Sequence, residues 1–238
     1  MYGSVRGDRL PLTRKKERCG RARLLDWKME LLFATGNKFK FELMKRRLEI
    51  FKELELINPK DLGLKIDVIE DGKTAGENAY KKAITYFNAT KIPTIAEDSG
   101  LYIDKFKDEE QPGLFVRRIN GVDDLSDEEV FAYYYNKISE YGGESKAHYF
   151  SGVALVDQKG EVHSTIFNET DFLLTTKLYN SESIRGGILE PMSYDLEVKK
   201  YFGERTLEEE ENHYKELNEG YRTLIKKYVI ERRINNGK

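Results

Sequence analysis

The sequence has few residues that cross-link or bind metals, and it has no long apolar run. Its 238 residues contain one cysteine, Cys19, which excludes a disulfide within the chain and is typical of a reducing compartment. The three histidines, His148, His163 and His213, do not have the spacing of a zinc site. No apolar stretch approaches the roughly 20 residues that span a bilayer. We therefore expect a cytoplasmic protein that does not contact a membrane.

Positive and negative charges nearly balance over the whole chain, but they are unevenly distributed between its first 28 residues and the rest. Residues 1–28 carry nine Lys/Arg and three Asp/Glu, a net charge of +6, whereas the rest carries 31 and 39, a net charge of −8. An acidic body is a poor partner for nucleic acid, but it can bind a nucleotide where its basic residues gather in one cleft. We expect residues 1–28 to be a disordered, dispensable extension and residues 29–238 to form one two-lobed domain. A nucleic-acid-binding arm and an organelle-targeting peptide are the alternatives for the extension.

Hydrophobic spacing in the body predicts a mixture of strands and helices. Strands are expected at residues 30–33, 54–57, 65–69, 92–96, 101–103, 147–156 and 162–175, the last two as a long hairpin. Helices are expected at about 41–51, 74–89, 127–141 and 212–233. Strands and helices in this order, with long antiparallel pairs, are typical of an α/β fold with a mixed sheet.

The first predicted strand and helix are joined by Thr35-Gly36-Asn37-Lys38-Phe39-Lys40. Free backbone N–H groups at the start of a helix attract anions, and the two lysines add positive charge beside them. Gly36 permits a tight turn, and the side chains of Thr35 and Asn37 are suited to bonding phosphate oxygens. The segment lacks the longer Gly-rich span of a Walker loop. A capped helix with solvated lysines is the alternative.

Two adjacent carboxylates, Glu97 and Asp98, stand where the apolar run at 92–96 gives way to Ser99-Gly100. Strand residues alternate sides, so these two would point to opposite faces, one toward a cleft and the other tied back. Burying a carboxylate pair is unfavourable unless positive charge compensates it. A divalent cation would supply that charge, which suggests phosphate chemistry. A strand that ends in an acidic turn is the alternative.

Two further blocks complete a pattern. Residues 66–70 and 77–83 place an acidic segment before a helix that carries Lys82, and Pro112-Gly113 precedes Phe115 and Arg117. In order and spacing, the four blocks resemble the inosine triphosphate pyrophosphatase family, which hydrolyses non-standard purine nucleoside triphosphates. The resemblance covers about Met29 to Ile230 and is strongest in the first half. It implies an elongated mixed central sheet with two lobes, a nucleotide cleft between them and a homodimer.

The resemblance also implies roles for particular residues. Phosphate-binding candidates are Thr35, Gly36, Asn37, Lys38, Lys40, Lys82, Ser99 and Arg117. Metal candidates for Mg²⁺ are Glu70, Asp98 and Glu97. Asp98 would orient or deprotonate the water that attacks the α-phosphorus, which gives the nucleoside monophosphate and pyrophosphate. Lys81 and Glu77 are expected to be a solvated charge and a helix-capping residue, respectively.

The chain departs from the family pattern near its C-terminus. Where the family has Gly-Phe-Gly-Tyr-Asp-Pro, this chain keeps only Tyr194-Asp195, and where the family has Ser-His-Arg it has Gly220-Tyr221-Arg222. On this basis Arg222 would be a fixed donor that rejects adenine. Asp195 would accept from the ring N1–H, and Tyr194 would stack on the base or pack in the core.

The main hypothesis is a Mg²⁺-dependent pyrophosphatase that removes inosine, deoxyinosine and xanthosine triphosphates from the nucleotide pool. Its substrate is the nucleoside triphosphate, and no nucleic acid partner is expected. The altered C-terminal segments leave two alternatives. One is a nucleotide-binding homologue without turnover, and the other is a pyrophosphatase for modified pyrimidine triphosphates. A nucleic-acid binder that uses the basic residues 1–28 is the weakest hypothesis, because residues 29–238 are acidic.

Overall fold

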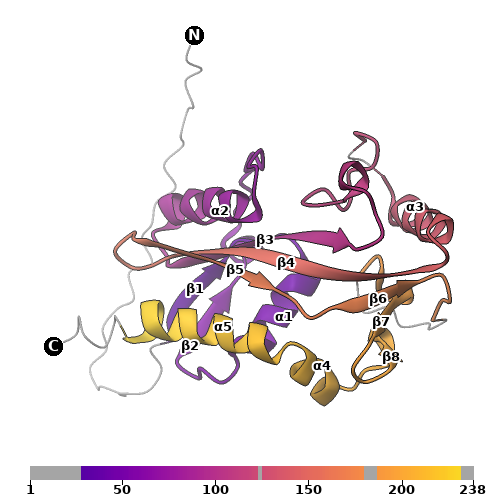
Figure 1. Ribbon diagram of the computed structural model, residues 1–238. Helices are drawn as coiled ribbons and strands as arrows, with labels where there is room; N and C mark the ends of the chain where they lie inside the picture. Colours follow the sequence, from indigo (N-terminus) through magenta and orange to yellow (C-terminus); the bar gives the residue numbers. More distant parts are fainter. Residues whose placement is uncertain (1–27, 123–124, 180–186, 232–238) are drawn as a thin grey trace, which may run out of the picture.

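A long mixed sheet forms the centre of the computed structural model, which describes residues 28–122, 125–179 and 187–231 (Figure 1). Over these residues the sheet has eight strands in the order β2-β1-β3-β4-β6-β7-β8, with β5 beside part of β4. The strands are β1 (Met29–Phe33), β2 (Leu54–Ile57), β3 (Thr94–Ile103), β4 (Glu144–Val156), β5 (Val162–Asn168), β6 (Phe172–Thr175), β7 (Ser193–Asp195) and β8 (Lys200–Tyr201). β1 is parallel to β2 and β3, and the other pairs are antiparallel. The predicted α/β fold with an elongated mixed sheet is confirmed.

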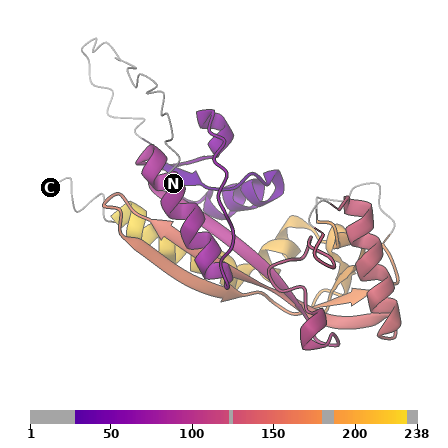
Figure 2. The same cartoon turned by 90° about the horizontal axis from the view of Figure 1, so that it is seen from above.

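The helices cover the sheet at its two ends. They are α1 (Lys38–Leu48), α2 (Ala75–Thr90), α3 (Asp127–Glu140), α4 (Leu207–His213) and α5 (Lys215–Ile225), which continues as a π-helical turn, Lys226–Ile230. At the β1 end, α2 covers one face and α1 and α5 cover the other, while α3 lies at the β6 end (Figures 1 and 2). None of the helices in the described ranges is long and apolar enough to cross a membrane.

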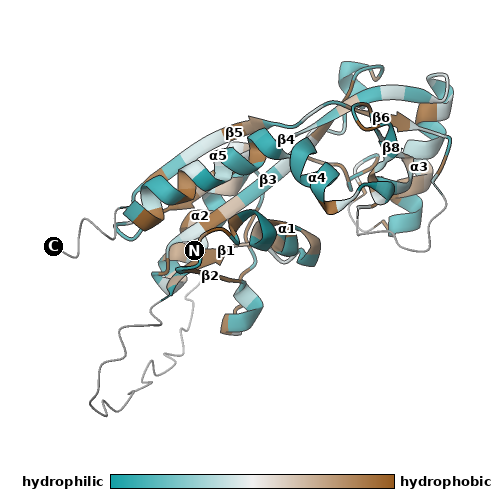
Figure 3. Ribbon diagram, turned by 90° about the horizontal axis from the view of Figure 1, so that it is seen from below, coloured by the Kyte–Doolittle hydropathy of each residue, from teal (hydrophilic) through white to brown (hydrophobic). Residues whose placement is uncertain are grey.

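The long pair of β3 and β4 joins the two ends (Figure 2). One core cluster packs α1 and α5 against odd-numbered residues of β1 and β3, and another packs α2 against Leu32, Ala96 and Ala154. A third cluster, under α3, contains Leu101, Ile103 and residues of β6. Along α5, polar and apolar residues alternate (Figure 3), and Leu217, Tyr221 and Ile225 are buried against the sheet.

Four sets of predicted elements differ from the structure. The strands predicted at 92–96 and 101–103 form one strand, β3, because all of residues 94–103 pair with β4, so Glu97 and Asp98 lie within a strand and not at its end. Residues 65–69 form no strand, because Ile66 and Val68 pack against the α2 cluster while their backbone has no strand partner among the described residues. The second arm of the hairpin divides into β5 and β6, which pair with different parts of β4. The closing helix starts earlier, at Leu207, where Thr206 caps it, and it is interrupted at Tyr214. Of the predicted extension at residues 1–28, residues 1–27 lie outside the described residues.

Gly152 brings the start of α2 onto the sheet. It pairs with Asp98 across the β3–β4 ladder. A Cβ atom added to Gly152 would lie 2.3 Å from the backbone of both Ala75 and Gly76. The first turn of α2 therefore rests on the glycine backbone, directly beside Asp98, and only a residue without a side chain permits this approach.

Replacing Gly152 by Ala is expected to lower the melting temperature. The new methyl group must displace helix backbone, and overpacking of this kind typically costs about 1–3 kcal/mol. Thermal unfolding followed by circular dichroism measures the effect. Gly76→Ala is the matched control, because the nearest atom to its added Cβ is 3.9 Å away. Equal melting temperatures for Gly152→Ala and the wild type would contradict this account of the packing.

Candidate active site

A cleft of about 680 Å³ runs along the sheet between the α1 end and the loop that precedes α3. Four of the phosphate-binding candidates, Asn37, Lys40, Ser99 and Arg117, line it together with Glu97. The far part is lined by residues from the C-terminal third, namely Glu190, Ser193, Phe202, Arg205, Glu210 and Tyr214. Segments distant in sequence therefore share one concave surface.

The acidic motif lies on a free stretch of the edge of β3. β1 pairs with β3 only as far as Ile95, and the next partner on that edge is Gly113, opposite Leu101. Residues 97–100 thus have no strand partner on this side within the described chain. The turn from β1 into α1 fills the space nearby, because β1 ends beside Ile95.

The start of α1 is capped by neighbouring side chains, as the capped-helix alternative predicts. Asn37 caps the helix, and its Oδ1 accepts from the backbone N–H groups of Phe39 and Lys40 at 2.9 and 3.2 Å. Thr35 Oγ1 accepts from the N–H of Asn37 at 3.1 Å. Gly36 does not have a left-handed backbone, and an added Cβ would meet no atom within 4 Å. The turn itself therefore does not require glycine, and the space above Gly36 is open.

Lys40 reaches from α1 to β3. Its Nζ donates to Ser99 Oγ at 2.8 Å and lies 3.0 Å from Glu97 Oε1. Glu97 and Ser99 are two residues apart on a strand, so they lie on the same face. Burial lowers the pKa of Lys40, whereas the charge of Glu97 and, more weakly, that of Asp98 raise it. The net effect is a raised pKa. Lys40 therefore remains a cation at the free edge.

Glu97 is held on all sides by donors. Its Oε2 accepts from the Tyr221 hydroxyl at 2.6 Å and lies 3.9 Å from Arg47 Nη1. Burial alone would raise the pKa of Glu97, but Lys40, Arg47 and Tyr221 together lower it to about 2. Both carboxylate oxygens are thus engaged, and they lie on the opposite face from Asp98. The structure does not bring Glu97 together with Glu70 as a metal ligand, which corrects the sequence-based expectation.

Asp98 faces α2. Its Oδ1 lies 3.4 Å from Lys82 Nζ, which also lies 3.0 Å from Glu70 Oε2. Its Oδ2 accepts from Asn78 Nδ2 at 2.9 Å. The structure therefore brings Glu70, Lys82 and Asp98 together. Lys81 instead pairs with the exposed Asp71, as expected of a solvated charge.

Asn78 is a positioning residue that the sequence reasoning did not single out. It is buried, and its Oδ1 accepts from the Gly72 N–H at 2.8 Å while its Nδ2 donates to Asp98. Both polar ends of the amide are thus used, which fixes the carboxylate. Its position in the sequence could have indicated this role, because Asn78 precedes Lys82 by one helical turn and lies on the buried face of α2.

The remaining phosphate candidates, Lys38 and Arg117, are exposed. Lys38 is exposed at the start of α1. Arg117, which lines the cleft from the facing loop, is also exposed, and its Nη2 lies 2.7 Å from Asp127 Oδ1 at the start of α3. Both side chains are exposed to solvent and are not buried inside the cleft.

The residues predicted to read the base are not brought to the cleft. Asp195 is fully buried, and its Oδ2 lies 3.1 Å from Arg205 Nη1 and 2.8 Å from His213 Nδ1. Arg222 lines a separate hollow, donates to the Arg47 carbonyl at 2.8 Å and pairs with two glutamates. Tyr194 packs edge-on against Tyr201 and does not line the cleft. Local motif matching failed here because the partners of these side chains come from other parts of the chain.

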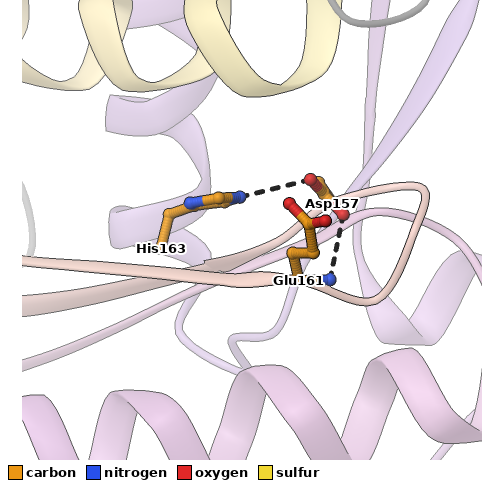
Figure 4. Close-up of side chains that lie close together, drawn as sticks. All are labelled: Asp157, Glu161 and His163. Atoms are coloured by element: carbon orange, nitrogen blue, oxygen red, sulfur yellow. Dashed lines mark hydrogen bonds and ion pairs between the residues drawn. The ribbon is translucent and has the colours of Figure 1, made fainter. Parts of the chain in front are cut away.

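A second group of possible metal ligands lies at the β4–β5 turn (Figure 4). Among the described residues, donor atoms of Asp157, Glu161 and His163 lie within 4.8 Å of one another. Asp157 Oδ1 accepts from the N–H groups of Lys159 and Glu161, and Oδ2 lies 3.2 Å from His163 Nε2. His163 stacks on Tyr228 with ring centroids 3.6 Å apart. These contacts close the turn and attach it to the C-terminal helix, away from the cleft.

Comparisons with known proteins identify the family to which the chain belongs. A model of the Ham1 family matches residues 31–172, more than half of the chain. A protein of Hydrogenobaculum sp. named dITP/XTP pyrophosphatase is 41% identical over 96 residues, which are 38% of this chain and 44% of that protein. One of Leptospira biflexa with the same name is 31% identical over 177 residues, 74% of this chain and 85% of that protein. This chain thus spans less than half of the first of these relatives.

A solved structure of a HAM1 protein from Coxiella burnetii has the same fold. Its TM-score is 0.66 at 21% sequence identity, and the match covers 84% of this chain and 99% of that one. This structural match covers more of the chain than the family model, which ends at residue 172.

Replacing Glu97 by Gln is expected to destabilise the fold at pH 7 by about 3 kcal/mol, because Lys40 and Arg47 lose a buried counter-charge. The pKa of Glu97 is about 2 in the folded protein and near 4.5 in an unfolded chain. Its stabilising contribution is therefore complete above pH 4.5 and is lost as the pH falls toward 2. Denaturant unfolding from pH 7 to pH 2 should show the difference from the wild type shrinking across that window. Glu55→Gln, at an exposed strand position, is the control, and a pH-independent difference for Glu97→Gln would refute the assignment.

Proposed function

Because the chain belongs to the Ham1 family, we propose that it is a nucleoside triphosphate pyrophosphatase that acts on inosine, deoxyinosine and xanthosine triphosphates. It hydrolyses them to the monophosphate and pyrophosphate, which removes non-standard purines from the nucleotide pool. One observation carries the proposal. Lys40, in the first turn of α1, pairs with Glu97 on one face of the free edge of β3, and the next residue of that edge, Asp98, pairs with Lys82 on the other face.

The triphosphate binds along this edge. Lys40 and Lys82 provide positive charge for phosphate oxygens, the positive end of the α1 dipole adds to it, and the open space over Gly36 admits them. The exposed Lys38 and Arg117 add positive charge. Neutralising the phosphates in this way is the larger part of catalysis in phosphoryl transfer, since the charge repels an attacking nucleophile.

The carboxylates of Glu70 and Asp98 fit a divalent cation. Both lie within 3.4 Å of the Lys82 ammonium, so they converge on one positively charged group. Carboxylate oxygens are the ligands that Mg²⁺ prefers, and it keeps several waters, so two carboxylates and a phosphate are sufficient. When bound, Mg²⁺ would neutralise phosphate charge and acidify a coordinated water.

Asp98 is the general base. Its carboxylate takes the proton of the water that attacks the α-phosphorus, and the bond from that phosphorus to the bridging oxygen of pyrophosphate breaks. Asn78 keeps Oδ2 in one orientation, and the Lys82 ammonium lies beside Oδ1. Glu97 instead holds Lys40 in position from the other face.

We also propose that the protein is a cytoplasmic homodimer, that residues 29–238 act as one domain, and that neither nucleic acid nor a membrane takes part. The family resemblance supports the dimer, and the acidic charge of residues 29–238 supports the absence of nucleic acid. Light scattering coupled to size-exclusion chromatography measures the assembly, and a monomeric mass would refute the dimer.

The activity is tested by incubating the protein with Mg²⁺ and a panel of triphosphates, and by measuring monophosphate and pyrophosphate. Turnover of inosine triphosphate well above that of adenosine triphosphate is expected. Release of inorganic phosphate in place of pyrophosphate would contradict the site of attack. Tight binding without hydrolysis would indicate a homologue that lacks turnover, and a preference for a modified pyrimidine would change the substrate class.

Replacing Asp98 by Asn should reduce kcat by about 10²–10⁴-fold, the usual contribution of a general base. The dissociation constant for inosine triphosphate should change by only a few-fold, because the cations that bind phosphate remain. Asp71→Asn is the matched control, since Asp71 is close by but exposed and paired with Lys81. If the Asp98 variant keeps near-normal turnover, the base has been assigned wrongly.

A further inference from the structure

The far end of the cleft has a fixed arginine. Arg205 lines the cleft, yet only 4% of it is exposed. Its guanidinium lies 3.8 Å from the centre of the Phe202 ring, and its Nη1 lies 3.1 Å from Asp195 Oδ2. A hydrogen bond also joins it to the side chain of Tyr214. A guanidinium with a buried counter-ion on one edge and an aromatic ring on its face has little freedom to rotate.

The counter-ion of Arg205 is itself held firmly. Asp195 accepts from the backbone N–H groups of Glu197 and Val198 through Oδ1, and Oδ2 also lies beside His213. Burial and the charge of Arg205 lower the pKa of His213, so the imidazole is neutral near pH 7. The positive charge of Arg205 is thus balanced within the protein. Its role in the cleft is to present donors in a fixed place rather than to add net charge for a phosphate.

One wall of the cleft links Arg205 to the phosphate-binding end. The guanidinium carbons of Arg205 and Arg47 lie 5.4 and 5.9 Å from the centre of the Tyr214 ring. Arg47 lies 3.9 Å from Glu97, and Glu97 lies 3.0 Å from Lys40. A nucleotide with its phosphates at Lys40 would therefore extend along this wall, past Tyr214, toward Arg205 and Phe202.

A carboxylate lies beside the same end of the wall. Glu190 lines the cleft, and its Oε1 is buried without a hydrogen-bond partner in the part of the chain that the structure describes. The Cβ position of Gly203, two residues before Arg205, is 3.2 Å from this oxygen. An unpaired buried carboxylate oxygen is unfavourable, and a ligand N–H that donates to the Glu190 carboxylate would relieve the penalty.

We propose that Arg205 and Glu190 read the base of the nucleotide, Arg205 as the donor and Glu190 as the acceptor. This rests on the proposed function, and it assigns the base reading to residues other than Asp195 and Arg222. A 6-oxo purine presents a carbonyl acceptor next to its ring N1–H donor, so it matches this pair. Adenine presents an amino donor and an unprotonated ring nitrogen, an acceptor, in the same places. Its donor would therefore face the donor Arg205, and its acceptor would face the acceptor Glu190. Phe202 and Tyr214 provide aromatic surface next to the base.

The proposal is tested with Arg205→Lys and Glu190→Gln. Lysine keeps the ion pair with Asp195 but loses the planar set of donors, and glutamine keeps the shape of Glu190 but can either donate or accept. In each variant the ratio of kcat/KM for inosine triphosphate to that for adenosine triphosphate should fall roughly tenfold or more. Inhibition by inorganic tripolyphosphate, which has no base, should stay unchanged. Thermal unfolding shows which variants are folded.

Arg222→Lys is the matched control, because Arg222 is also an ion-paired arginine but does not line the cleft. It should leave the ratio as in the wild type. A folded Arg205→Lys or Glu190→Gln protein with an unchanged ratio would overturn the proposal, even while pyrophosphate release confirms the reaction. The Glu190 variant decides the matter if the Arg205 variant does not fold. If the wild type hydrolyses no triphosphate, the proposed function fails, and dissociation constants for inosine and adenosine triphosphates then test the base reading in the same variants.

Discussion

The ion pair between Lys40 and Glu97 is the interaction on which the arrangement of the cleft depends. It joins the first turn of α1 to the free edge of β3, and Tyr221 and Arg47 complete the cluster from α5 and α1. A buried carboxylate requires such partners, since without them its charge would be strongly disfavoured. The same contacts that stabilise Glu97 therefore fix the position of Lys40. Structural and functional roles are combined in one cluster.

The opposite face of β3 is organised by backbone contact rather than by charge. Gly152 lets the start of α2 rest on β4, and this places Asn78 and Lys82 against Asp98. Adjacent residues on one strand consequently have different surroundings. Glu97 contacts Lys40, Arg47 and Tyr221, whereas Asp98 contacts Asn78 and a lysine that it shares with Glu70. In the proposed mechanism, this division makes Asp98 the base and leaves Glu97 to position Lys40.

The C-terminal third builds the other wall of the cleft with residues that the family pattern does not predict. Asp195, the part of the Tyr-Asp pair that resembles a base reader, is the buried counter-ion of Arg205. Arg222 is held by glutamates of α4 and α5 outside the cleft. Arg222 was expected to donate to the base and Asp195 to accept from it. Arg205 and Glu190, which line the cleft, offer a donor and an acceptor in their place.

Features that depend on near neighbours could be predicted from the sequence. Period-two alternation predicted that Glu97 and Asp98 face opposite sides of a strand, and the Asn37 cap and the Thr74 cap follow from residues within one helical turn. Only the tertiary structure decided which carboxylate is tied back, that Asn78 orients Asp98, that residues 65–69 lack a strand partner, and that Asp195 and Arg222 are used elsewhere. The physical reason is that the partner of a charged or extended segment comes from a distant part of the chain. Tyr221, which holds Glu97, lies 124 positions away in the sequence, and no local pattern specifies such a contact.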